Sequence, residues 1–133
     1  MTTGEMKKRL PKKERLYLRK DLERLFACGQ SFIAYPLRVV YRLETASSET
    51  QPGVAIMAGA AKRRVRHAVG RNRIKRLIRE AFRLHKHPLA ERCALEGLCL
   101  HIAFMYVGEG LPTHAAVKKA MNKALNLILP QMP

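Results

Sequence analysis

The chain has 133 residues and a formal charge of +16 at pH 7, from 26 Lys and Arg against 10 Asp and Glu. Its length fits one domain, and a hydrophobic share of 47% excludes a wholly disordered basic tail. No apolar run approaches the roughly 20 residues of a membrane span. Three cysteines without a CxxC pair favour free thiols over a disulfide framework or zinc site, so we expect a cytoplasmic protein.

The N-terminal part predicts a basic arm and then a helix. Residues 1–13 are interpreted as a flexible basic arm, and we expect a single domain over residues 14–130. Apolar residues recur at helical spacing over residues 17–28, namely Leu18, Leu22, Leu25 and Phe26. Gly29 is a suitable residue to end this helix.

Two strands are predicted next. Residues 33–43 alternate with period two, which indicates one half-buried strand. Pro36 cannot donate a ladder hydrogen bond, so it places this strand at an edge or marks a bulge. The outward side of the strand is expected to carry Phe32, Arg38 and Arg42. Residues 53–61 form an apolar run of small residues, which predicts a second strand.

Residues 66–87 give the clearest helical pattern. One apolar stripe would dock the helix on a sheet; it consists of Ile74, Leu77, Ile78, Ala81 and Leu84. A helix of this length spans about 30 Å. Pro88 is expected to end the helix or to follow its end.

The C-terminal third predicts a short helical turn, a strand and a helix. The turn covers residues 89–96, and residues 98–107 are apolar on both faces, as in a central strand. Thr113 is a good N-cap for a last helix ending near Leu129. The order helix, strand, strand, helix, strand, helix indicates an α+β sandwich. The strands on either side of the basic helix could be parallel neighbours joined by a crossover.

Positive charge is concentrated in residues 62–87, which hold eleven Lys and Arg and a single acid, Glu80. The usual i,i+4 acidic partners are missing, and like charges at this density destabilise an isolated protein. A polyanionic partner is therefore expected, with nucleic acid first and an anionic membrane surface second. A solvated charged face is the alternative interpretation. The candidate contacts are Lys62, Arg63, Arg64, Arg66, Arg71, Asn72, Arg73, Lys75, Arg76 and Arg79.

The stretch AVGRNRIKRLIREAFRLHKH, residues 68–87, resembles the RNR signature of the bacterial ribonuclease P protein component. Looser similarity covers ERLYLRKDLERLFACGQSF and IAFMYVGEGLPTHAAVKKAMNKAL. The resemblance implies a compact α/β sandwich with a left-handed crossover, against the usual rule. It also implies a small subunit, in a 1:1 complex, that assists a catalytic RNA in removing the 5′ leader from precursor tRNA.

The resemblance implies two binding regions. The signature helix and the loop before it, which hold the candidate contacts above, would bind the catalytic RNA subunit. A cleft between the first helix and the sheet would hold the leader of precursor tRNA. The family usually has two aromatic residues on that helix, where this chain has Leu22 and Phe26. Phe32, Arg38 and Arg42 are weaker cleft candidates, and a core position is the alternative for Phe26.

No residues with the pattern of a protein catalytic site are found. Ser/His/Asp sets, phosphate loops and paired carboxylates are missing from the sequence, and the His85–His87 pair has no further ligands at matching spacing. We therefore expect no catalytic residue, metal or cofactor on the protein; the resemblance places Mg²⁺ mainly on the RNA.

Two other functions fit the charge pattern. A ribosome-associated or structural RNA-binding protein would use the same cations without a leader cleft. A DNA-binding regulator would insert residues 66–87 into a major groove, but no preceding helix completes a helix-turn-helix motif. A membrane partner is not expected.

Overall fold

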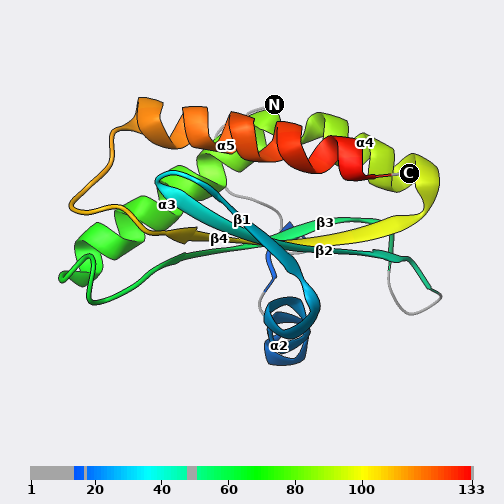
Figure 1. Ribbon diagram of the computed structural model, residues 1–133, viewed down its shortest axis with the longest axis horizontal. Coiled ribbons are helices and arrows are strands. Elements are labelled where there is room, and N and C mark those ends of the chain that lie inside the picture. The colour runs from blue at the N-terminus through cyan, green and yellow to red at the C-terminus, as the bar shows by residue number, and fades with distance from the viewer. Residues whose placement is uncertain (1–13, 17, 48–50, 133) are drawn as a thin grey trace, which may run out of the picture.

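A computed structural model describes residues 14–16, 18–47 and 51–132; the predicted arm, residues 1–13, lies outside them. Within these residues the chain forms one mixed sheet with the strand order β1-β2-β4-β3 (Figure 1). Antiparallel pairs join β1 to β2 and β2 to β4, whereas β3 and β4 are parallel. The strands are β1 (Gln30–Ala34), β2 (Leu37–Thr45), β3 (Gly53–Ala60) and β4 (Leu98–Tyr106).

Helices cover both faces of the sheet (Figure 1). Of the helices in the described residues, α2 (Arg19–Cys28) is the one on the first face, where it contacts β2 and β4. The other face carries α3 (Ala68–His85), α4 (His87–Glu96) and α5 (His114–Ile128), followed by the short 3-10 helix η2 (Leu129–Gln131). This arrangement confirms the predicted α+β class and the parallel pairing of the strands that flank the basic helix. The handedness of the crossover stays a prediction.

The hydrophobic core has two parts, one on each face of the sheet. The larger part lies under α3, α4 and α5 and includes the fully buried Phe82 and Phe104. The smaller part lies under α2 and contains Leu16, Leu25, Val40 and Ala103. Adjacent residues of β4 supply both parts, which confirms the prediction of a central strand that is apolar on both faces.

The predicted single strand over residues 33–43 is wrong. The chain reverses at Tyr35 and Pro36, so that β1 and β2 form an antiparallel hairpin in which Ala34 faces Leu37. Pro36 suits this turn because it has no N–H to donate to a ladder. The period-two pattern continues through the turn, so the alternation alone does not reveal that there are two strands.

The basic helix is shorter than predicted and its apolar stripe differs by one residue. It ends at His85, and Pro88 lies in the first turn of α4, where a missing N–H costs nothing. Leu84 is half exposed, whereas Phe82 is fully buried. Thr113 caps α5 as predicted, because its Oγ1 accepts a hydrogen bond from Ala116 N at 3.0 Å.

Candidate nucleic-acid interface

Helix α3 is oriented by the residues that it buries. Ile74, Ile78, Ala81 and Phe82 are fixed in the core between the helix and its neighbours. The rest of the helix surface therefore presents its polar residues to solvent. Of the predicted contacts on it, Asn72, Arg73 and Arg76 are exposed, while Arg71, Lys75 and Arg79 are half-buried.

Most cations of α3 have no carboxylate partner in the part of the chain that the structure describes. Among residues 14–16, 18–47 and 51–132, no carboxylate forms an ion pair with the Arg and Lys between positions 71 and 79. Glu80, the one acid of the region, binds Arg83 instead, with 2.5 Å between Oε2 and Nη2. The helix thus offers uncompensated positive charge, to which an anionic ligand would be attracted.

The loop between β3 and α3 extends this positive surface beyond the sheet. Its exposed cations are Lys62, Arg63, Arg64 and Arg66. Two arginines also hold the loop in place, since Arg64 Nη1 donates to Val107 O at 2.9 Å and Arg71 Nη1 donates to the carbonyls of Val65 and Arg66 at 3.0 and 2.8 Å. Such fixed donors lose less conformational entropy on binding than free ones do.

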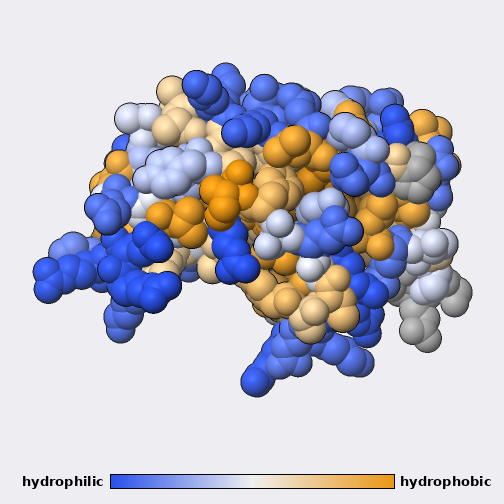
Figure 2. Space-filling model, viewed as in Figure 1, coloured by the Kyte–Doolittle hydropathy of each residue, from blue (hydrophilic) through white to orange (hydrophobic). Residues whose placement is uncertain are grey.

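A hollow lies on the face of the sheet that carries α2. Figure 2 shows it between two hydrophilic projections, one made by the loop after β3 and the other by α2. The strand register places Arg38, Met57 and Met105 on this face, and Met57 packs against the smaller core. At Gly59 an added Cβ would lie 2.9 Å from the Met105 sulfur, so only glycine leaves this neighbour undisturbed.

Three of the predicted cleft residues lie on the face of the sheet that carries α2. Helical spacing puts Leu22 and Phe26 on one flank of α2; Leu22 packs against the smaller core, and Phe26 is 45% exposed. Arg38 is exposed on the same face of the sheet. Gly29 fixes the position of α2, because its N–H donates to Leu25 O and a Cβ there would approach that oxygen to 2.5 Å.

The other two cleft candidates lie elsewhere. Phe32 faces the larger core, where its ring meets that of Tyr41 with 6.1 Å between centroids, because the hairpin puts it opposite Val39. It therefore does not share a side with Arg38. Arg42 does, but it lies on the far side of Val40 from Arg38 and is bound to Glu44 at 2.8 Å.

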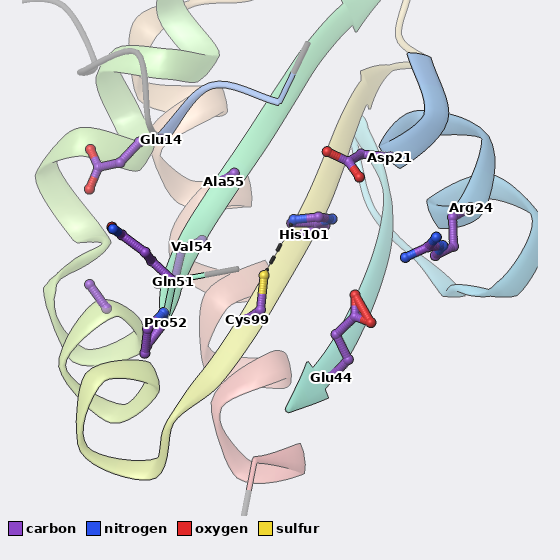
Figure 3. A pocket seen from close by; sticks show the side chains of 12 residues that line it. Glu14, Asp21, Arg24, Glu44, Gln51, Pro52, Val54, Ala55, Cys99 and His101 are labelled. Atoms are coloured by element: carbon purple, nitrogen blue, oxygen red, sulfur yellow. Dashed lines mark hydrogen bonds between the residues drawn. The ribbon is translucent and has the colours of Figure 1, made fainter. Parts of the chain in front are cut away.

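A cavity of about 390 Å³ is found near the opposite flank of α2 (Figure 3). Its lining includes Glu14, Asp21 and Glu44, together with His101 and Arg24. Figure 3 shows Asp21 and Arg24 projecting from α2 on one side of β3 and Glu14 on the other. Three carboxylates make this concavity unfavourable for phosphate.

The Cys99–His101 pair in this cavity is not an activated nucleophile. The Cys99 sulfur lies 3.5 Å from His101 Nε2. Burial raises the pKa of the thiol, and Glu44 and Asp21 raise it further; a nucleophilic cysteine needs the reverse. Among the described residues, no three His, Cys, Asp or Glu side chains are grouped so as to hold a metal ion.

One cation of the interface was missed by the sequence analysis. Residues 14–16, here called the strap, lie along the outer edge of β3, where Leu16 N donates to Ile56 O at 2.6 Å and Arg15 forms a parallel bridge. Burial lowers the pKa of Arg79 of α3, and the positive charge of Arg15 lowers it further. Nothing in the local sequence distinguishes Arg15 from the other basic residues around it, because its position depends on pairing at the sheet edge.

Comparison with known proteins gives one consistent family. The family model described as Ribonuclease P matches residues 10–127. The ribonuclease P protein component of Porphyromonas gingivalis is 44% identical over 93% of this chain and 89% of its own length; that of Chlorobium phaeobacteroides is 31% identical over 84% and 83%.

Solved structures show the same fold. The RNase P protein of Staphylococcus aureus superposes with a TM-score of 0.65 at 20% identity, covering 86% of this chain and 94% of that one. The RNase P protein from Thermotoga maritima gives 0.51 at 23% identity, covering 88% and 96%. No helix in the described part of the chain is both long and apolar enough to span a membrane.

Proposed function

The chain belongs to the ribonuclease P protein family, and on that premise we propose that it binds both the catalytic RNA of ribonuclease P and the 5′ leader of precursor tRNA. The observation that carries the proposal is the pairing of two surfaces on one small body. One is the acid-free cationic face of α3 with its entry loop, and the other is the hollow beside α2.

The surface of α3 and its loop is assigned to the catalytic RNA. Lys and Arg that neutralise backbone phosphates release condensed counterions, which gives affinity without reading sequence. Arginine can also direct two N–H donors at one phosphate. The exposed Arg73 and Arg76 and the loop cations Lys62 and Arg63 are free to make such contacts, while Arg64 and Arg71 keep the loop in position.

The hollow is assigned to the leader. Binding of a single RNA strand requires positive charge along its phosphate backbone and flat apolar side chains on which its bases stack. Arg38 supplies the positive charge, and Phe26 supplies the stacking surface. Leu22 gives apolar contact without stacking. The protein would then favour precursor over mature tRNA by differential binding, because only the precursor carries the leader. Hydrolysis and its Mg²⁺ are assigned to the RNA, in a cytoplasmic 1:1 complex.

The test is reconstitution with the cognate RNA subunit. The protein should improve processing of leader-bearing tRNA at low Mg²⁺, and the complex should bind precursor more tightly than mature tRNA. Phe26→Ala should reduce that preference by the value of one base stack, about 1–3 kcal/mol, or roughly 5- to 150-fold. Leu22→Phe should increase it.

Leu127→Ala is the matched control, because Leu127 on α5 is 47% exposed, close to the 45% of Phe26, but lies on the opposite face of the sheet. It should leave the preference unchanged. Equal affinity of the wild-type complex for precursor and mature tRNA would favour a structural RNA-binding protein without a leader site instead.

A further inference from the structure

Tyr35, in the turn between β1 and β2, carries an aromatic ring that makes few contacts within the protein. It is 71% exposed, more than any other aromatic residue in the described part of the chain, where Phe26 comes next at 45%. Among residues 14–16, 18–47 and 51–132, no other aromatic ring packs against it and its hydroxyl has no hydrogen-bond partner. A flat surface on which another ring can stack is therefore open to solvent.

The turn that carries Tyr35 is held in place on two sides. The antiparallel pairing of β1 with β2 closes the hairpin. On the side of β4, Pro36 O accepts a hydrogen bond from Val107 N at 2.8 Å, and a Cβ on Gly108 would lie only 3.1 Å from Pro36 Cβ. An aromatic side chain has few rotatable bonds, so on a fixed backbone it loses little conformational entropy when it binds a ligand.

Positive charge lies close to this turn. One source is Arg64 of the loop after β3, whose Nη1 donates to Val107 O at 2.9 Å, so that Val107 joins this loop to the turn. Another is Arg38, which is exposed on β2 next to the turn and has no carboxylate partner in the described ranges. Ile33, opposite Arg38 in the hairpin, is 56% exposed. Cations beside exposed apolar side chains, one of them aromatic, suit the binding of a single RNA strand.

We propose that Tyr35 stacks on one nucleobase of the 5′ leader of precursor tRNA, at a subsite separate from that of Phe26. The proposal rests on the proposed function and deepens it, because it adds a stacking residue outside α2. Arg38 and Ile33 face the hollow that is assigned to the leader, and the turn is continuous with both. A single strand also presents unpaired bases, whereas most bases of a folded RNA are paired or stacked on one another.

Phe26 and Tyr35 are assigned to different bases because Arg38 lies between their elements. On this face of β2, Arg38 has the turn on one side and Val40 on the other, and Val40 packs against Leu25 of α2. A leader that contacts both rings therefore passes Arg38, which supplies positive charge for the phosphate backbone between the two bases.

The first experiment measures how tightly precursor and mature tRNA bind to the complex of the full-length protein with its RNA subunit. Tyr35→Leu keeps apolar bulk but removes the ring, so it should weaken precursor binding roughly 5- to 150-fold, the value of one base stack, and leave mature tRNA unaffected. Tyr35→Phe should bind as wild type, because the hydroxyl has no partner in the described structure. In a double variant with Phe26→Ala, the two fold-losses should multiply, because two different bases are involved.

Leu95→Ala is the matched control, because Leu95 is 77% exposed but belongs to α4, on the face of the sheet opposite α2. It should change neither affinity. Wild-type precursor binding by Tyr35→Leu, or equal weakening of precursor and mature tRNA, would overturn the proposal. A loss in Tyr35→Phe as large as that in Tyr35→Leu would do the same, since the ring would then not be the contacting group.

The second experiment uses the fact that the sequence contains no tryptophan. Tyr35→Trp places a single indole at the turn, and stacking on a base should quench its fluorescence. We expect quenching when precursor tRNA is added to the assembled complex, and none when the RNA subunit or mature tRNA is added. Leu95→Trp should show no change at any step. Quenching by the RNA subunit alone would assign the ring to the catalytic RNA and refute the proposal.

The two levels of inference fail in different ways. Equal affinity of the wild-type complex for precursor and mature tRNA would contradict the proposed function itself. A wild-type preference for precursor that Tyr35→Leu leaves intact would contradict only the subsite at Tyr35.

Discussion

His101 is held in its neutral form by the cavity beside α2. Burial lowers its pKa below the usual 6.5, and Arg42 and Arg24 act in the same direction. Asp21 and Glu44 act against them, and the neighbouring Cys99 thiol is uncharged. Protonation of this ring is therefore less favourable in the folded state than in the unfolded chain. The free energy of unfolding must then depend on pH in the range where His101 titrates.

The sign of that dependence gives a prediction. Because the folded pKa lies below the unfolded value of 6.5, the unfolded state binds more protons as the pH falls through 6.5, and stability is lost in that range. His101→Gln should reduce this loss. Urea unfolding at about pH 7.5 and about pH 5.5 measures it, with His114→Gln, at an exposed residue, as the control. An identical loss in wild type and His101→Gln would contradict the prediction.

Helix α3 was predictable and the β1–β2 hairpin was not, for physical reasons that differ. Apolar residues at 3.6-residue spacing specify a helix face locally, so the buried Ile74 and Ile78 could be named from the sequence. In the hairpin, alternation continues across the turn, and only the pairing of Ala34 with Leu37 shows that Phe32 and Arg38 face opposite sides. A one-residue change of register reverses every side chain of a strand.

The residues of the candidate site also divide into those that local sequence identifies and those that depend on the fold. Charge density along one helix identified α3 and its loop, because sequence neighbours are spatial neighbours there. Arg15 and the role of Arg71 in holding the loop depend on contacts made by the fold, through the strap and through the carbonyls of Val65 and Arg66. The three-dimensional arrangement is therefore needed to distinguish the cations that are available to a ligand from those that hold the loop in position.

Two arginines of α3 differ in whether a carboxylate of the protein is paired with them. Arg76 is exposed and has no carboxylate partner among the described residues, whereas Arg83 binds Glu80 at 2.5 Å. Arg76→Ala should weaken binding to the RNA subunit and reduce the slope of log affinity against log salt by about 0.9, one phosphate contact. Arg83→Ala should change the slope much less. Filter binding across a salt series provides the measurement, and equal slopes for Arg76→Ala and wild type would rule out a contact there.

Direct contacts between the protein and RNA should be separable from the long-range attraction between their net charges. The net charge is +16, and cations of the described residues lie on both faces of the sheet. Helix α5 holds three exposed lysines, Lys118, Lys119 and Lys123, on the face opposite α2 and its hollow. These lysines contribute to the overall field, which attracts RNA from a distance, but they lie outside the two surfaces assigned to RNA.

Salt distinguishes the two contributions, since the Debye length is about 10 Å at roughly 0.1 M and shortens as salt is added. Replacing the three α5 lysines by Gln lowers the net charge from +16 to +13 (16 − 3). This variant should associate with the RNA subunit more slowly at about 0.05 M salt and at the wild-type rate at about 0.3 M. A second variant with the same net charge, Lys62→Gln, Lys75→Gln and Arg76→Gln, should also dissociate faster at both salt concentrations, because it loses phosphate contacts. If stopped-flow kinetics gave the same behaviour for both variants, total charge rather than the α3 surface would govern binding.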